Sequence, residues 1–287
     1  MIGGISLKAL INLTDFHKAY DILAGSKYYY EIMNNINSYT RNIRNESSLN
    51  QFLNSYPFIK KHGENVKNVA LMIGKELSLE TKSLEIINKS SLYHDIAQVF
   101  FPSEIQGSFN PYNDSQIQAL AAHPIISAEL MGALYQSSDI YNTIILHHEA
   151  LDGSGFPLKL KNAGIPLEAQ VLRIADQYVS LTMEDHFFTP ESKENIILDI
   201  CTKMGEIYHE DIVIAFLRVI RKELKSNEVH FVDIDKKIND WRFRTYNLDN
   251  KLPISVVLIQ KNLKVDSNVD LVSKVANMNT IEQKSII

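Results

Sequence analysis

Two adjacent histidines, His147 and His148, precede a polar, glycine-rich loop that runs from Asp152 to Pro157. Neighbouring side chains on a helix point about 100° apart, at ~3.6 residues per turn. Metal coordination is the commonest reason to keep neutral imidazoles together. The glycines allow positive φ angles and let the backbone approach a ligand closely. The pair and its loop therefore indicate a metal site beside a binding loop, with a solvated helix end as the alternative.

Further polar residues are set into otherwise apolar helical segments upstream and downstream. Together with the histidine pair, the set is His62, His94, Asp95, His123, His147, His148 and Asp176. Burying such groups unpaired is costly, and satisfying all of them with one another would require many donors and acceptors to match. Imidazoles mixed with carboxylates suit iron, manganese, nickel or zinc better than magnesium or calcium. The set thus indicates a site for divalent transition-metal ions, for which our expectation is iron or manganese, with nickel or zinc as the alternatives.

The order of these residues resembles that of the HD-GYP family, a branch of the HD superfamily of metal-dependent phosphohydrolases. The resemblance covers about residues 60 to 222. The matching pieces are His62, His94-Asp95, His123-Pro124, His147-His148-Glu149, the loop from Asp152 to Pro157, and Ala175-Asp176. The resemblance implies an all-α domain with a metal cluster inside a helical bundle. It also implies hydrolysis of the bacterial second messenger cyclic di-GMP.

The resemblance also assigns roles to the individual residues. His62, His94, Asp95 and Asp176 would hold one metal, and His123, His147 and His148 the second, with Asp95 as the bridge. Some members hold a third metal through a glutamate four residues before the first histidine; Phe58 occupies that position here, which favours two metals. Asp95 and Gln98 are the expected catalytic residues. The expected substrate contacts are Glu149, Asp152, Gly153, Ser154, Gly155, Phe156, Pro157 and Arg173.

Several positions depart from the family pattern on the substrate side. Gln98 stands where the family has a lysine, Phe156 replaces the tyrosine of the GYP motif, and Asp185 stands where an arginine contacts phosphate. A carboxylate beside a phosphate is repulsive. Arg173 lies three residues before Asp176 and, by helical spacing, is the cation that would compensate.

Three hypotheses about function follow from this pattern. The leading one is a phosphodiesterase that hydrolyses a cyclic dinucleotide, cyclic di-GMP by preference, through a hydroxide held at a binuclear metal centre. The second is a catalytically weak HD-GYP module that binds a nucleotide or a partner protein as a signalling adaptor. The third is a hydrolase of a different phosphorylated substrate.

Composition narrows the class of protein. The 287 residues are 45% hydrophobic, which is enough for a sizeable core, and the net charge of −5 argues against binding DNA or RNA. The single cysteine, Cys201, suits a reducing compartment. No run approaches the ~20 apolar residues of a membrane span. We expect a cytoplasmic protein of undetermined oligomeric state.

The predicted fold class is mainly α: an HD-type helical bundle with a helical N-terminal extension and a small C-terminal appendage containing β-structure. The predicted domains are residues 1–60 (helical), 61–224 (HD-GYP-like) and 225–287 (small α/β extension). Apolar residues at helical spacing predict helices over 63–77, 81–95, 115–134 with a break at Pro124, 140–148, 167–182, 192–204 and 210–224. Two β-rich runs lie in the tail, at 229–234 and 254–259.

Overall fold

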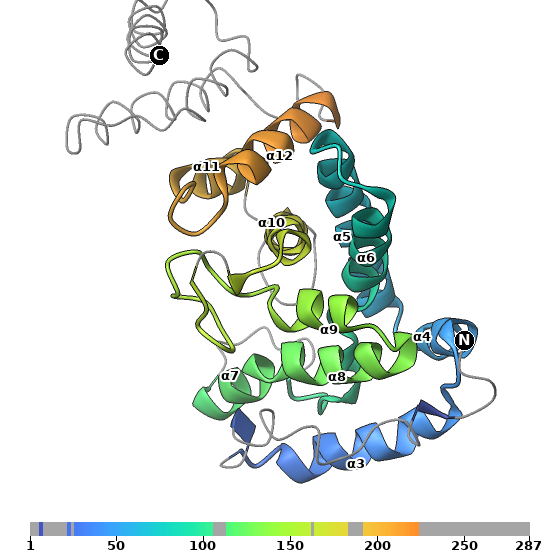
Figure 1. The fold of residues 1–287 in the computed structure, drawn as a ribbon. Helices are drawn as coiled ribbons and strands as arrows, with labels where there is room; N and C mark the ends of the chain where they lie inside the picture. Colours follow the sequence, from blue (N-terminus) through green and yellow to red (C-terminus); the bar gives the residue numbers. More distant parts are fainter. Residues whose placement is uncertain are drawn as a thin grey trace, which may run out of the picture. The chain divides into compact units, whose positions relative to one another are not determined.

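The structure is a computed structural model that describes residues 6–7, 22–23, 26–105, 113–161, 164–182 and 192–223 (Figure 1). The described residues are mainly α-helical, as predicted, and one isolated bridge among them pairs Met204 with Tyr208. The β-rich runs of the tail and Asp185 lie outside the described residues. The chain divides into two compact units, Met1–Pro190 and Glu191–Ile287.

The first described helices of unit 1 are α3 (Tyr29–Tyr39), the 3-10 turn η2 (Thr40–Asn42) and α4 (Glu46–Leu53). The helix α4 begins at a capping box, in which the Asn45 and Ser48 side chains each accept from the other's backbone N–H. The buried side chains of α3 and α4 belong to the same apolar core as the later helices. The helices α3 and α4 are therefore packed onto the bundle.

The helices α5 (Pro57–Glu76) and α6 (Thr81–Tyr93) pack against each other at very close range. Gly63 of α5 permits this, because a Cβ atom there would overlap the backbone carbonyl oxygen of Leu92 in α6. The residues next to this contact are His62 on α5 and His94 at the end of α6. The glycine thus brings two of the predicted ligands together.

The next elements are η3 (Ile96–Phe100), α7 (Asp114–Ala121), α8 (His123–Tyr135) and α9 (Ser138–Ile145). The break in the predicted helix falls at Ala122 rather than at Pro124, because proline is tolerated in the first turn of a helix. The segment Asp114–Tyr135 is long and apolar enough to cross a membrane, with a mean hydropathy of 1.3, a feature that the sequence prediction missed. Since 61% of this window is buried, packing inside the bundle accounts for its composition.

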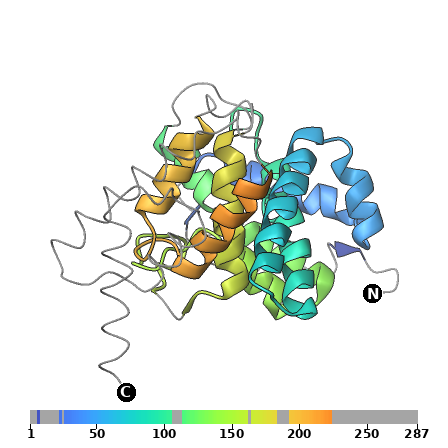
Figure 2. The same cartoon turned by 90° about the horizontal axis from the view of Figure 1, so that it is seen from above.

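The helix α10 (Leu167–Thr182) has the bounds predicted from the sequence and packs against α5, α6 and α9 (Figure 2). In unit 2, α11 (Lys193–Thr202) begins after its cap Ser192 and packs against α12 (Glu210–Glu223). The predicted ligands all lie in unit 1.

Candidate metal centre

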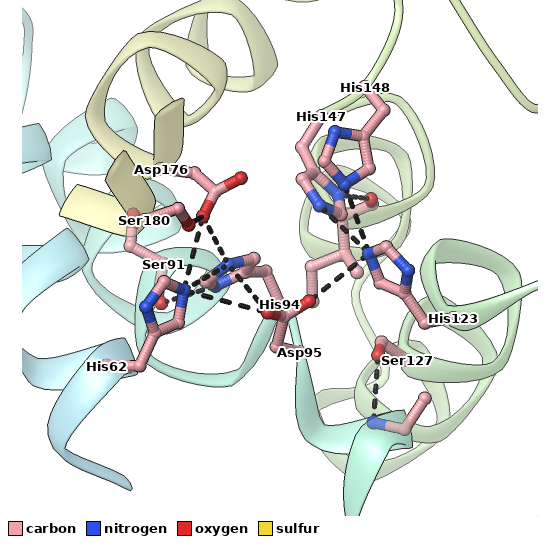
Figure 3. A network of polar contacts seen from close by, with 12 residues as sticks. His62, Ser91, His94, Asp95, His123, Ser127, His147, His148, Asp176 and Ser180 are labelled. Carbon is pink, nitrogen blue, oxygen red and sulfur yellow. Dashed lines mark hydrogen bonds and ion pairs between the residues drawn. The ribbon is translucent and has the colours of Figure 1, made fainter. Parts of the chain in front are cut away.

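The structure brings all seven predicted ligands into one cluster (Figure 3). His62 comes from α5 and Asp176 from α10, while the other five lie at helix ends: His94 and Asp95 after α6, His123 at the start of α8, and His147 and His148 after α9. Four of the imidazoles and Asp176 are less than a tenth exposed. The cluster is therefore assembled where helices end, inside the bundle.

Three of the histidine rings are oriented by the same kind of local hydrogen bond. The ring Nδ1 atoms of His94, His123 and His147 lie 2.9, 2.6 and 2.6 Å from the carbonyl oxygen three residues earlier in each case. These carbonyls are in the last turns of α6, α7 and α9, where helix carbonyls lack intrahelical partners. A carbonyl can only accept a hydrogen bond, so each Nδ1 carries the proton. A ring that carries only this proton presents its Nε2 lone pair to the cluster.

The Nε2 lone pairs of His123 and His147 face each other. The Nε2 atoms of His123 and His147 are 3.4 Å apart, and that of His148 is 3.1 Å from His123. With both Nδ1 atoms protonated, neutral His123 and His147 have no proton to place between their Nε2 atoms. Burial lowers the pKa of all three imidazoles, that of His148 to about 3, which keeps them neutral. Converging neutral lone pairs of this kind fit a cation.

Asp95 lies between two groups of ligands. Its Oδ2 is 3.6 Å from the Nε2 atoms of both His62 and His94, and its Oδ1 is 3.2 Å from Nε2 of His123. The buried Oδ1 accepts no hydrogen bond. One carboxylate thus offers an oxygen to each group, the arrangement that a bridging ligand requires.

The first group contains the second carboxylate, Asp176, whose Oδ1 is 3.2 Å from His62 Nε2 and 3.4 Å from His94 Nε2. The Ser180 hydroxyl, one turn further along α10, donates to the same Oδ1 at 3.0 Å. Although burial lowers the pKa of His94, the charges of Asp95 and Asp176 raise it to about 9. Burial opposes ionisation of both carboxyls, but their histidine neighbours hold the pKa values low. Without a metal, a proton on His94 therefore offsets part of the negative charge.

The cluster forms one wall of a cavity of about 440 Å³. Its lining residues are Phe58, Ile59, His62, Asp95, Gln98, Ile117, Leu120, Ala121, His123, His148, Phe156, Asp176 and Ser180. None of these described lining residues is a lysine or an arginine. The cavity therefore combines a ligand-bearing wall with apolar walls.

The glycine-rich loop contributes Phe156 to this cavity, and the ring stacks on His148 with centroids 4.7 Å apart and planes at 17°. Asp152, Gly153, Ser154, Gly155 and Pro157 do not line it. The Asp152 carboxylate instead accepts from the Ser154 N–H at 2.8 Å.

The structure also gives Gly155 a use that the sequence did not suggest. A Cβ atom there would overlap the backbone of His148, Glu149 and Ala150. Its close backbone approach is to the chain itself, where we had expected approach to a ligand.

Glu149 and Arg173, which we predicted to contact the substrate, instead make hydrogen bonds to the backbone around the loop. Glu149 is 1% exposed, and its carboxylate accepts backbone N–H bonds from Leu158, Lys159 and Leu160 at 2.6, 3.0 and 2.8 Å. The Arg173 guanidinium donates to the Glu149 carbonyl oxygen at 2.7 Å. A buried carboxylate with these partners holds the chain after the loop, so its position does not support the expectation that Glu149 contacts the substrate.

The apolar and hydroxyl-bearing lining was missed at the sequence level. A usable signal existed, because Phe58 and Ile59 lie four and three residues before His62, and Ser180 lies four residues after Asp176. Residues at these spacings share a helix face. A search of the positions one helical turn before and after each predicted ligand would have found these residues.

Comparison with known proteins places this site in a family. The profile of the HD domain matches residues 47–212, more than half of the chain. The chain belongs to the HD domain family. The matched residues include all seven of the clustered ligands.

Curated relatives of this HD domain protein include the 3'3'-cGAMP-specific phosphodiesterase 1 of Vibrio cholerae, 30% identical over 125 residues, which are 44% of this chain and 29% of that protein. Cyclic di-GMP phosphodiesterase PdeB of Borreliella burgdorferi is 21% identical over 229 residues, 77% of this chain and 60% of that protein. A solved HDG"Y"P protein from Bdellovibrio bacteriovorus aligns with a TM-score of 0.49 at 14% identity, over 75% of this chain and 70% of that one. The predicted HD-GYP resemblance is confirmed. The chain spans less than two thirds of the length of these two curated relatives.

Proposed function

We propose that the protein is a metal-dependent phosphodiesterase that hydrolyses a cyclic dinucleotide, with cyclic di-GMP as its substrate. The observation that carries the proposal is the convergence, on the wall of a cavity, of unprotonated imidazole nitrogens and of an Asp95 Oδ1 that accepts no hydrogen bond. The relatives named as cyclic dinucleotide phosphodiesterases support the substrate class.

The donor set fits two divalent transition metals, with iron or manganese as our expectation. His62, His94 and Asp176 would hold one ion and His123, His147 and His148 the other, with Asp95 shared. When bound, such ions activate water and stabilise charge on a phosphoryl group. The chain's own contribution is to hold the ligands at helix ends inside the bundle and to set the cavity against them.

Gln98, one of the two expected catalytic residues, lies on the cavity wall, where it could face the leaving oxygen. An amide can donate a hydrogen bond to a leaving oxygen but has no proton to transfer at neutral pH. Protonation of that oxygen then falls to solvent. Because a missing charge-stabilising donor typically costs about 10²–10³ in rate, we expect slow turnover.

The lack of lysine and arginine among the described lining residues favours a second candidate, a catalytically weak module that binds a nucleotide or a partner protein as a signalling adaptor. The two candidates differ in turnover by the fully metallated protein. Gln98→Lys combined with Asp185→Arg should raise turnover more than metal occupancy if missing charge is the defect.

The deciding experiment uses one sample purified under reducing, anaerobic conditions for both metal analysis and turnover. We expect about two transition-metal ions per chain and slow conversion of cyclic di-GMP to a linear dinucleotide, measured beside 3'3'-cGAMP. Faster conversion of 3'3'-cGAMP would change the proposed substrate from cyclic di-GMP to 3'3'-cGAMP. A fully metallated protein that binds either compound and hydrolyses neither would establish the adaptor.

A further inference from the structure

The apolar part of the cavity wall comes from two helices and the glycine-rich loop. Phe58 and Ile59 belong to α5, Ile117 and Leu120 to α7, and Phe156 to the loop. Ile117 is 53% exposed, so a large apolar side chain at this wall remains in contact with water. This wall and the clustered ligands border the same cavity of about 440 Å³.

Helical spacing makes the apolar wall continuous with the ligands. Phe58 and Ile59 precede His62 by four and three residues on α5, which places all three on one helix face. Leu120 supplies the carbonyl that orients His123. A molecule with one end at the ligands would therefore lie against these apolar side chains.

The chemistry of a cyclic dinucleotide then restricts which of its parts can occupy the wall. Its phosphates are anionic and its riboses are hydroxylated, so the faces of its bases are its apolar surfaces. Base faces stack on aromatic side chains irrespective of their hydrogen-bonding edges. Phe58 and Phe156 supply two such rings, and purines offer larger faces than pyrimidines.

We propose that the apolar wall is a purine subsite in which Phe58 is the main stacking platform. The proposal rests on the proposed function for its choice of a nucleotide as the occupant. Such a subsite would select the base of the nucleotide. The metal centre cannot do so, because it would contact only the phosphodiester. The competing explanation is that these side chains serve packing alone.

The test measures equilibrium binding of GMP, UMP and inorganic phosphate to the metal-loaded full chain by calorimetry. We expect GMP to bind more tightly than UMP, and Phe58→Leu to weaken GMP by about tenfold or more. The affinity for inorganic phosphate should change by less than about twofold in this variant, since phosphate has no base whose stacking could be lost. Phe58 is preferable to Phe156 for substitution, because Phe156 also stacks on a ligand.

Phe52→Leu is the matched control, because Phe52 lies on α4 among other aromatic rings and does not line the cavity. Metal content is measured for every variant. Equal binding of GMP and UMP to the wild type, or an unchanged preference in Phe58→Leu, would overturn the subsite even if cyclic di-GMP is hydrolysed. A purine preference that Phe58→Leu removes would uphold it even if no cyclic dinucleotide is cleaved, in which case only the proposed activity fails.

Discussion

Glu149→Gln tests whether this buried carboxylate holds the loop or meets a substrate. Oε1 accepts from Leu158 and Lys159 and Oε2 from Leu160. A glutamine that keeps the first two bonds turns its NH₂ group toward the Leu160 N–H, which then loses its acceptor. An unpaired donor costs about 1–3 kcal/mol when buried, and the surviving bonds lose their charge assistance. Because these amides are only part-buried, we take about 1–3 kcal/mol for the whole change.

That cost should appear as local opening of the chain after the loop. Hydrogen exchange of the amides at 158–160 should accelerate by about 5- to 150-fold, since 1.4 kcal/mol is a factor of ten. Metal affinity should fall as well, because Glu149 follows His148 directly. Glu85→Gln, at an exposed site on α6, is the control for loss of a carboxylate. Unchanged exchange in Glu149→Gln with weakened nucleotide binding would refute this reasoning and restore the substrate-contact role.

Three further predictions concern the cluster. Asp95→Ala should lose both metals, because each group shares this carboxylate; stoichiometric metal retention would rule out the bridge. The metal-free protein keeps His94 protonated up to its pKa of about 9, so metal binding must displace that proton. The affinity for the metal should therefore rise about tenfold per pH unit below pH 9 and stay constant above it. Calorimetry that shows no proton release on metal binding at pH 7 would contradict this. Gly63→Ala should cost about 1–3 kcal/mol in unfolding free energy and weaken metal binding, since its Cβ meets the Leu92 backbone. In Gly74→Ala, the control on the same helix, the Cβ meets only side chains, and equal losses in the two variants would contradict the backbone clash.

Helix positions were predictable where the apolar periodicity is regular. The bounds of α10 match the prediction, and α6 begins at Thr81 as expected. The C-terminal ends near the histidines were wrong: α6 stops at Tyr93 and α9 at Ile145, two and three residues short of prediction. Their sequences continue in a helical pattern, but local composition carries no signal that an imidazole will take a carbonyl of the last turn.

The seven residues that cluster could be picked out from the sequence because charged and imidazole groups stand out against apolar helices. The environment of Glu149 could not be predicted from the sequence. An acidic residue beside a glycine-rich loop shows the same local pattern whether it faces solvent or is buried against three backbone amides. Gly155 shows the same difficulty, since glycine permits close approach without specifying what approaches. Such roles depend on how a loop folds back, which sequence spacing does not encode.

The helix ends and the ligand cluster are one feature of this fold. Carbonyls of the last turns of α6, α7 and α9 accept hydrogen bonds from His94, His123 and His147 and so fix the tautomers of these rings. The ring nitrogens that remain converge from these helix ends, with α5 and α10 completing the set through His62 and Asp176. Cations in the cluster would therefore connect residues in or next to five helices, α5, α6, α8, α9 and α10. Since a ligand bound only by the folded state stabilises that state, metal loading and bundle stability should rise together, and variants that disturb either should disturb both.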